Sequence, residues 1–170
     1  MPYNLFLDDD RMPAEVANYA NPVDIRPLYR KEEWAIVRNY PDFVKTVETR
    51  GVPAIISFDH DLYPHTWEKN LVDGKLNYAA DDFKDPEKRN GLHCMIWFFL
   101  FSLWNKGEPY ILVHTGNLNA AETMAGLIKG FSDKVNWDDK ALFINSIAHE
   151  SGMKKEAAFH MSQYMMYGED

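Results

Sequence analysis

Three short apolar segments, each followed at once by polar residues, constrain the fold of this chain most strongly. The segments are Tyr3–Leu7, Pro53–Phe58 and Tyr110–Val113. Nearly continuous apolar runs of this length are typical of parallel β-strands that are covered on both faces. A further strand is predicted over Trp34–Tyr40. Strands of this kind need helices to cover them, which indicates an α/β fold.

Helical patterns separate the predicted strands. Apolar residues recur at helical spacing over residues 42–50, and Gly51 then ends the pattern. The other predicted helices are Gly91–Asn105 with Asn90 as its cap, a helix capped by Asn119 that runs through Lys129, and a mostly helical tail from Asp138 to Tyr167. Alternating strands and helices predict right-handed crossovers and a mostly parallel sheet with helices on both faces, which is a three-layer sandwich.

We expect one α/β domain over residues 1–133, followed by a helical C-terminal extension over residues 134–170 that packs on the same domain. The segments near 14–33 and 63–90 lack clear periodicity and contain several prolines. They are predicted to be loop insertions, with room for one helical turn in the first. Together with the tail after about residue 134, they are expected to shape a substrate pocket or a contact between copies of the chain. A homo-oligomer is therefore one of the expected partners.

The composition excludes several classes of protein. The chain has 170 residues, of which 46% are hydrophobic, enough for one domain with a core. Its 18 basic and 26 acidic residues give a net charge of −8, which argues against duplex DNA as a partner. The single cysteine, Cys94, can build neither an internal disulfide nor a zinc cluster. With no targeting segment and no apolar run long enough to cross a membrane, a cytoplasmic location is expected.

The polar clusters that follow the three apolar segments are expected to converge, because the carboxyl ends of parallel strands share one edge of a sheet. The clusters are Asp8–Arg11, Asp59–Asp61 and His114–Asn117. Two carboxylates about 5 Å apart repel by about 3 kcal/mol at an effective dielectric near 20, so either one is protonated or a cation lies between them. Oxygen ligands suit Mg²⁺ or Mn²⁺, and Mg²⁺ commonly joins carboxylates to substrate phosphates. The clusters predict a phosphate site, although polar turns alone would explain part of the pattern.

Metal binding and proton transfer are assigned to the acids and histidines of these clusters. The predicted metal ligands are Asp8, Asp9 and Asp59. His60 and His114 are the candidate general acid and base, because imidazole titrates near neutral pH. Asp61 either orients His60 or ligates the metal. The alternative for both histidines is that they only structure their loops.

Substrate binding is assigned to the remaining polar residues. Arg11 is predicted to clamp a phosphate oxygen, and the alternative is an ion pair that only holds the acidic loop. Thr115 and Asn117 are predicted to donate hydrogen bonds to a phosphate, next to the N-terminus of the helix that follows.

The same residues resemble the motifs of the cyclic-phosphate-processing receiver-like family. That family has patterns like L-D-D-x-R-x-P, I-S-F-D-H-D-L and H-[ST]-x-N, which are similar to Leu7–Pro13, Ile56–Leu62 and His114–Asn117. Arg38 is also similar to a family position, which implies a place in substrate binding. The resemblance covers roughly residues 3–130 and implies a receiver-like, flavodoxin-like fold. It also implies activity on a cyclic nucleotide or on the 2′,3′-cyclic phosphate end of an RNA.

Two functions of different classes fit these observations. The first is a metal-assisted phosphoesterase that uses Mg²⁺ or Mn²⁺ to open a cyclic phosphate. The alternative is a non-catalytic receiver-like module that binds or sequesters a nucleotide or a partner protein. A phosphorelay role is disfavoured, because no fifth strand ends in the lysine that receivers use for signalling.

Overall fold

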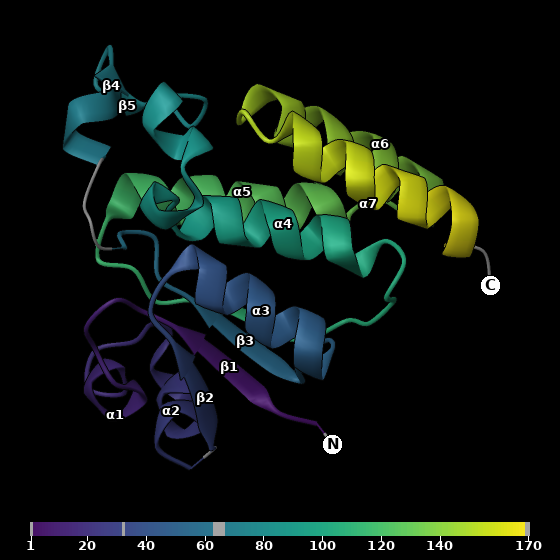
Figure 1. Cartoon of the computed structure of the whole chain (residues 1–170). Coiled ribbons are helices and arrows are strands. Elements are labelled where there is room, and N and C mark those ends of the chain that lie inside the picture. Colours follow the sequence, from purple (N-terminus) through teal and green to yellow (C-terminus); the bar gives the residue numbers. More distant parts are fainter. Residues whose placement is uncertain (1, 32, 63–66, 169–170) are drawn as a thin grey trace.

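The computed structural model describes residues 2–31, 33–62 and 67–168, and at its centre lies a four-stranded sheet (Figure 1). The strands are β1 (Asn4–Leu7), β2 (Trp34–Val37), β3 (Ile55–Phe58) and β6 (Tyr110–Val113). Their order is β2-β1-β3-β6, and all three pairings are parallel. The four predicted strands and the parallel sheet are thus confirmed. The second strand is shorter than predicted, because Asn39 caps the next helix by accepting a hydrogen bond from the backbone N–H of Asp42.

Helices cover both faces of the sheet and complete the three layers of a receiver-like α/β fold. Residues alternate between the faces, so Leu5 and Leu7 join one buried cluster while Phe6 joins another. The face with Leu5 and Leu7 is covered by α3 (Tyr40–Arg50), α4 (Gly91–Ser102) and α5 (Leu118–Ser132). All 12 residues of α4 are buried, which is why its sequence shows no polar face.

The opposite face is covered by the segment predicted as a loop over residues 14–33. It forms α1 (Pro13–Val16), a 3₁₀ turn (Val23–Ile25) and α2 (Arg26–Lys31). Val16, Ile25 and Tyr29 are buried against Phe6. The segment holds more helix than the single turn that was predicted. Its apolar residues are too few and too irregularly spaced to show a helical period, yet they are enough to close one face of a small sheet.

The C-terminal helices α6 (Trp137–Glu150) and α7 (Lys154–Tyr167) lie against α4, on the side away from the sheet (Figure 1). Ile144, Ala148 and Ala157 are fully buried and belong to the same apolar cluster as α4. In the part of the chain that the structure describes, no helix combines the length and the apolar character needed to cross a bilayer.

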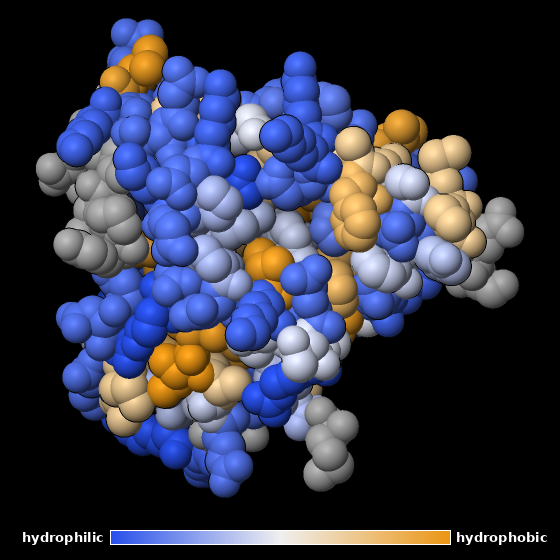
Figure 2. All heavy atoms as spheres, in the orientation of Figure 1, coloured by the Kyte–Doolittle hydropathy of each residue, from blue (hydrophilic) through white to orange (hydrophobic). Residues whose placement is uncertain are grey.

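Apolar side chains remain exposed on the outer side of these two helices, where Figure 2 shows paler and orange atoms among the blue surface. Leu142 of α6 and Phe159, Met165 and Met166 of α7 are each more than half exposed. A contact between copies of the chain through this tail stays a prediction.

The segment predicted as a loop over residues 63–90 contains short elements in its described part. They are β4 (Leu71–Val72) and β5 (Lys75–Leu76), which pair as an antiparallel hairpin, and three 3₁₀ turns at Trp67–Asn70, Asp81–Lys84 and Pro86–Lys88. Residues 63–66 lie outside the described residues. Asp73 and Gly74 join the two strands with φ angles of 51° and 76°. An Asp-Gly pair between short apolar strands is a hairpin signal that could have been read from the sequence.

One buried histidine of the C-terminal extension predicts how stability depends on pH. His160 is 3% exposed, and its Nδ1 accepts a hydrogen bond of 3.0 Å from Trp104 Nε1. Burial lowers the pKa of His160 to about 4, although Glu156 opposes the change. As pH falls from 6.5 to 4, the unfolded chain binds a proton at this site and the folded chain does not. The free energy of unfolding should then fall by up to about 3 kcal/mol.

Replacing His160 by Gln should remove this loss between pH 6.5 and pH 4, as measured by urea unfolding at several pH values. The matched control is H149Q, which removes an exposed histidine from the neighbouring helix α6. A variant H160Q that loses stability towards pH 4 as steeply as the wild type would contradict the prediction.

Candidate functional site

The carboxyl ends of the four strands present one row of polar side chains. The last residues of the strands pair with one another across the sheet, so the next residues also lie side by side. In the order of the strands, this row is Arg38, Asp8, Asp59 and His114. The predicted convergence of the strand ends is therefore a consequence of their common register.

A cleft of ≈ 1120 Å³ opens beside this row. One part of it, here called the near half, is lined by the residues that follow the strands: Asp9, Asp10, Arg11, Asp59, His60, Asp61, Thr115, Gly116 and Asn117. Seven of the ten predicted site residues thus line the cleft. The other three, Asp8, Arg38 and His114, lie outside its lining: Asp8 and Arg38 contact Arg11, and His114 contacts Asp8.

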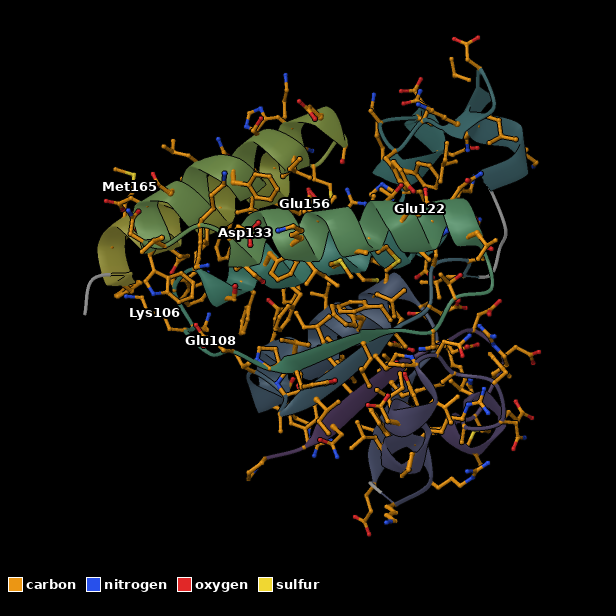
Figure 3. All side chains as sticks on the ribbon, turned by 180° about the vertical axis from the view of Figure 1, so that it is seen from behind. Lys106, Glu108, Glu122, Asp133, Glu156 and Met165 are labelled. Atoms are coloured by element: carbon orange, nitrogen blue, oxygen red, sulfur yellow. The ribbon has the colours of Figure 1, made fainter. Side chains whose placement is uncertain are left out.

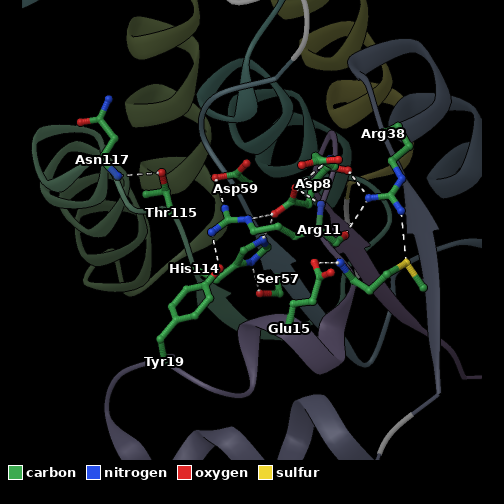
Figure 4. A network of polar contacts seen from close by, with 12 residues as sticks. Asp8, Arg11, Glu15, Tyr19, Arg38, Ser57, Asp59, His114, Thr115 and Asn117 are labelled. Atoms are coloured by element: carbon green, nitrogen blue, oxygen red, sulfur yellow. Dashed lines mark hydrogen bonds and ion pairs between the residues drawn. The ribbon is translucent and has the colours of Figure 1, made fainter.

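Asp8 is a buried carboxylate with a full set of donors (Figure 4). Its Oδ1 accepts from the backbone N–H groups of Asp10 and Arg11, at 2.9 and 2.8 Å. Its Oδ2 accepts from Arg11 Nε at 2.8 Å and lies 3.1 Å from His114 Nε2. Burial alone would raise the pKa of Asp8, but these hydrogen bonds and the Arg11 charge outweigh it and lower the pKa to about 2. Asp8 is therefore ionised near neutral pH.

Asp59 is the second buried acid, and its proton affinity is changed in the opposite direction. Burial and the negative charge of Asp8 raise the pKa of Asp59 to about 7, although Arg11 opposes them. The Asp59 side chain is only 5% exposed, and its Oδ1 lies 3.1 Å from Arg11 Nη2. Two neighbouring acids with pKa values of about 2 and about 7 form the kind of pair expected at a functional site.

Arg11 bridges the two acids and is positioned by a tyrosine. Its guanidinium pairs with Asp8 through Nε and with Asp59 through Nη2, and its Nη1 donates to the hydroxyl of Tyr19 (Figure 4). The ion pair considered as an alternative for Arg11 is thus present, and Arg11 also lines the cleft. A phosphate could engage Arg11 only if the guanidinium gave up part of these contacts.

His114 belongs to a buried chain of hydrogen bonds. Its side chain is fully buried and stacks on Phe6 at 4.5 Å between ring centroids. Since ionised Asp8 can only accept, His114 Nε2 must donate to it, so His114 Nδ1 accepts from the Ser57 hydroxyl at 2.7 Å. Ser57 in turn accepts from Tyr29 at 2.6 Å. Burial lowers the pKa of His114, which keeps the ring neutral and holds the direction of this chain.

Among the described residues, His60 is the histidine that lines the cleft. Its Nδ1 lies 2.6 Å from Asp61 Oδ1, and its Nε2 lies 3.1 Å from the hydroxyl of Tyr78. Because a carboxylate accepts, Asp61 fixes the tautomer with the proton on Nδ1. Asp61 therefore orients His60, as one of its two predicted roles requires.

Arg38 supports the acidic loop from the side of β2. Its Nη1 donates to the carbonyl oxygens of Asp8 and Arg11, at 3.0 and 2.7 Å, and its Nη2 lies 3.2 Å from the sulfur of Met12 (Figure 4). Arg38 thus belongs to the site by binding the backbone carbonyl oxygens of the loop that carries Asp8 and Arg11.

Thr115 and Asn117 shape the start of α5. Asn117 is the cap, because its side chain accepts from the backbone N–H of Ala120 at 3.1 Å. The prediction of Asn119 as the cap was wrong, because the chain is already helical from Leu118 onward. The Thr115 Oγ1 accepts from the Asn117 N–H at 3.2 Å, so the hydroxyl proton is available to another acceptor. Both side chains line the cleft next to the helix N-terminus, as a phosphate site requires.

A glycine allows α4 to begin directly against the second polar cluster. The Gly91 N–H donates to the carbonyl oxygen of His60 at 2.8 Å. A Cβ at Gly91 would lie 1.7 Å from the carbonyl oxygen of Asp59, which no side chain can tolerate. The backbone of Asp59 and His60 is therefore held by close contact with the most buried helix.

Sequence analysis missed four residues that complete the site. Tyr19, Tyr29 and Tyr78 lie in segments predicted as loops, and Ser57 lies inside a buried strand. Ser57 carries the clearest sequence signal, because it is the only polar residue in the apolar run Pro53–Phe58 and a buried hydroxyl needs a partner.

The donor set can be compared with the requirements of a divalent metal. Asp8, Asp59 and His114 each offer one ligand atom, and these atoms lie within 4.8 Å of one another. Both nitrogens of His114 and both oxygens of Asp8 are already hydrogen-bonded, and Asp59 pairs with Arg11. Carboxylate oxygens suit Mg²⁺ or Mn²⁺, and Asp59 is the member of this group that lines the cleft, so Asp59 with Asp8 beside it is where the donor set fits such an ion.

The parallel sheet and its acidic carboxyl edge define the class of receiver-like α/β proteins. A family model described as the cyclic-phosphate processing receiver domain matches residues 3–130. Because the match covers about three quarters of the chain, the protein belongs to this family, as its motifs predicted. Neither the search of curated proteins nor the search of solved structures found a match.

Proposed function

We propose that this protein is a metal-dependent phosphoesterase that opens a cyclic phosphate, either of a cyclic nucleotide or at the 2′,3′-cyclic end of an RNA. The observation that carries the proposal is the pair of buried acids at adjacent strand ends. Asp8 has a pKa of about 2 and Asp59 of about 7, and Asp59 lines a cleft large enough for a ligand. Membership of a family described by cyclic-phosphate processing supports the choice of substrate.

The charge of the near half supports the need for a cation. Its carboxyl groups are Asp9, Asp10, Asp59 and Asp61, and Arg11 is the one arginine or lysine among its described residues. An anionic phosphate would be repelled unless further positive charge were present. Mg²⁺ or Mn²⁺ held by Asp9 and Asp59 would neutralise the acids, polarise the phosphoryl oxygen and activate a water molecule.

His60 is the residue placed to move the proton. Asp61 holds its Nδ1 proton, so Nε2 can accept the proton of the attacking water once Tyr78 yields its contact. The water oxygen bonds to phosphorus and the ring P–O bond breaks. The leaving oxygen takes a proton from solvent water and becomes a hydroxyl of the phosphomonoester, and His60 then releases its proton to solvent. Thr115 and the N-terminus of α5 would bind the phosphoryl oxygens.

His114 is proposed as a positioning residue in this reaction. Its fully buried ring cannot reach a substrate in the cleft, but its Nε2 holds Asp8 next to Asp59. Arg38 has a comparable role, because it holds the backbone of Asp8 and Arg11 in place. Arg11 would bind phosphate when a cation takes over part of its pairing with the acids.

A turnover screen read by mass spectrometry tests this proposal. Purified protein with Mg²⁺ or Mn²⁺ would meet 2′,3′-cyclic, 3′,5′-cyclic and cyclic-oligonucleotide phosphates, with Asp59→Asn as the control. A phosphomonoester product that requires the metal and disappears in the control is the expected result. Absence of product from every compound with both metals would overturn the assignment.

A non-catalytic binding module is the second candidate, and one observation favours it. Arg11 already pairs with both Asp8 and Asp59 within the protein, so part of the negative charge of the two acids is offset without a metal. In that case a ligand would be depleted from solution in the same screen and recovered unchanged after denaturation.

A further inference from the structure

The cleft is larger than a cyclic phosphate needs, and its second part differs in chemistry from the first. Binding cavities for whole drug-sized ligands measure about 300–1,000 Å³, and this cleft has ≈ 1120 Å³. The far half is formed by the β4–β5 hairpin, Tyr78 and the first turns of α5. It contains the apolar side chains Leu71, Leu76 and Ala120, whereas every side chain of the near half is polar. A ligand that fills both halves therefore carries an apolar or aromatic part beyond its phosphate.

The far half is built as a fixed wall. The positive φ angles of Asp73 and Gly74 give a tight two-residue turn, and the Asn77 N–H donates to the Asn70 carbonyl at 2.8 Å beyond the two strands. Tyr78 then ties the hairpin to the near half, because its hydroxyl contacts His60 Nε2 and its carbonyl accepts from His93 Nε2 at 2.9 Å. Tyr78 thus links the far half to His60 in the near half.

Two carboxylates are among the polar side chains of the far half, which also include Lys75, Asn119 and Thr123. Glu122 projects from α5 on the side of the hairpin (Figure 3), and Asp73 lies at the hairpin tip. An ionised carboxylate only accepts hydrogen bonds and can accept two in parallel. Guanine matches this pattern with two adjacent N–H donors on one edge. Adenine and cytosine place an acceptor nitrogen beside their amino group, and uracil places a carbonyl on each side of its N–H.

Building on the proposed function, we propose that the far half binds the base of a nucleoside cyclic phosphate and that Glu122 selects guanine. The base would lie between the apolar side chains of the hairpin and α5, with Glu122 accepting from its two adjacent N–H groups. Leu71 is 45% exposed, so its burial by a base would add apolar contact area. The near half would hold the phosphate.

The test measures binding of three probes in the presence of Mg²⁺: guanosine 2′,3′-cyclic phosphate, uridine 2′,3′-cyclic phosphate, and glycerol 1,2-cyclic phosphate, which has no base. Isothermal titration gives each dissociation constant, and mass spectrometry of the same samples detects turnover. Where a probe is turned over, kcat/KM replaces the dissociation constant. The proteins are the wild type, Glu122→Gln and the matched control Glu150→Gln, which changes an exposed glutamate of α6.

We expect the wild type to prefer the guanosine probe over the uridine probe at least tenfold, and to bind the base-free probe most weakly. E122Q should weaken the affinity for the guanosine probe about tenfold and leave the affinities for the other two probes unchanged, because Gln cannot accept two hydrogen bonds through a charged group. E150Q should behave as the wild type.

Equal affinity for all three probes, or no binding at all, would overturn the inference, as would E122Q that matches the wild type. The outcomes separate it from the proposed function. Tight binding of the guanosine probe that depends on Glu122, with the probe recovered unchanged, would support the base site and contradict the proposed phosphoesterase activity. Turnover of all three probes at equal kcat/KM would contradict the base site and support the proposed phosphoesterase activity.

Discussion

Asp59→Asn should abolish turnover, and its free energy of unfolding at pH 8 should be at least as high as that of the wild type. Loss of the cleft-facing carboxylate removes the proposed metal ligand, so kcat/KM should fall by at least about 10³-fold. The free energy of unfolding of the variant should instead rise, because burial and Asp8 raise the pKa of Asp59 to about 7 in the folded wild type. Between pH 4 and pH 7 the unfolded chain loses this proton before the folded chain does, so the wild type loses stability as pH rises.

Asparagine resembles the protonated acid and cannot ionise, so this loss should be absent in the variant. The expected gain at pH 8 without metal is on the order of 2–4 kcal/mol, measured by urea unfolding at pH 5.5 and pH 8. Asp24→Asn, at an exposed position, is the matched control. D59N that is both inactive and strongly destabilised at pH 8 would mean that Asp59 supports the fold rather than the reaction.

Gly91→Ala should be among the most damaging single substitutions in the chain. The added methyl would lie 1.7 Å from the Asp59 carbonyl oxygen and 2.9 Å from the Cα of His60. Relief requires α4 to separate from the second polar cluster, which would strain the buried helix and displace both site residues. We expect a loss of at least about 4 kcal/mol in the free energy of unfolding, or failure to fold.

Gly126→Ala is the matched control, because Gly126 also lies in a helix and a Cβ there meets nothing within 4 Å. This variant should gain about 0.5–1 kcal/mol, since alanine favours the helix over glycine. Thermal unfolding of the two variants beside the wild type measures both effects. G91A that unfolds within 1 °C of the wild type would contradict the close contact.

The sheet and the convergence of its strand ends could be predicted because both follow from local patterns. Apolar runs define the strands, and parallel pairing then aligns whatever follows them, so Asp8, Asp59 and His114 could be brought together on paper. The different surroundings of the two histidines His60 and His114 could not be predicted. His114 directly follows β6, and its ring stacks on Phe6 inside the structure, whereas His60 is one residue further beyond β3 and lines the cleft.

The segments with little periodicity were predicted least well. Residues 14–33 bury Tyr29 and residues 67–90 present Tyr78 to His60, and in both cases a single aromatic side chain contacts residues far away in the sequence. Contacts of this kind leave no repeating pattern, because they depend on where the tertiary structure places each loop. The pairing of Arg11 with both acids is similar, since it requires the register of β1 against β3.

The origin of the two halves of the cleft has a consequence for how this protein can be re-engineered. The acids come from strand ends that are held by the sheet and by α4, whereas much of the opposite wall is one hairpin, which contacts His60 through Tyr78. Residues 71–76 can therefore be varied without changing the strand ends. Under the proposed function, a library at these residues and Glu122 would vary the recognised molecule while Asp8 and Asp59 keep their arrangement.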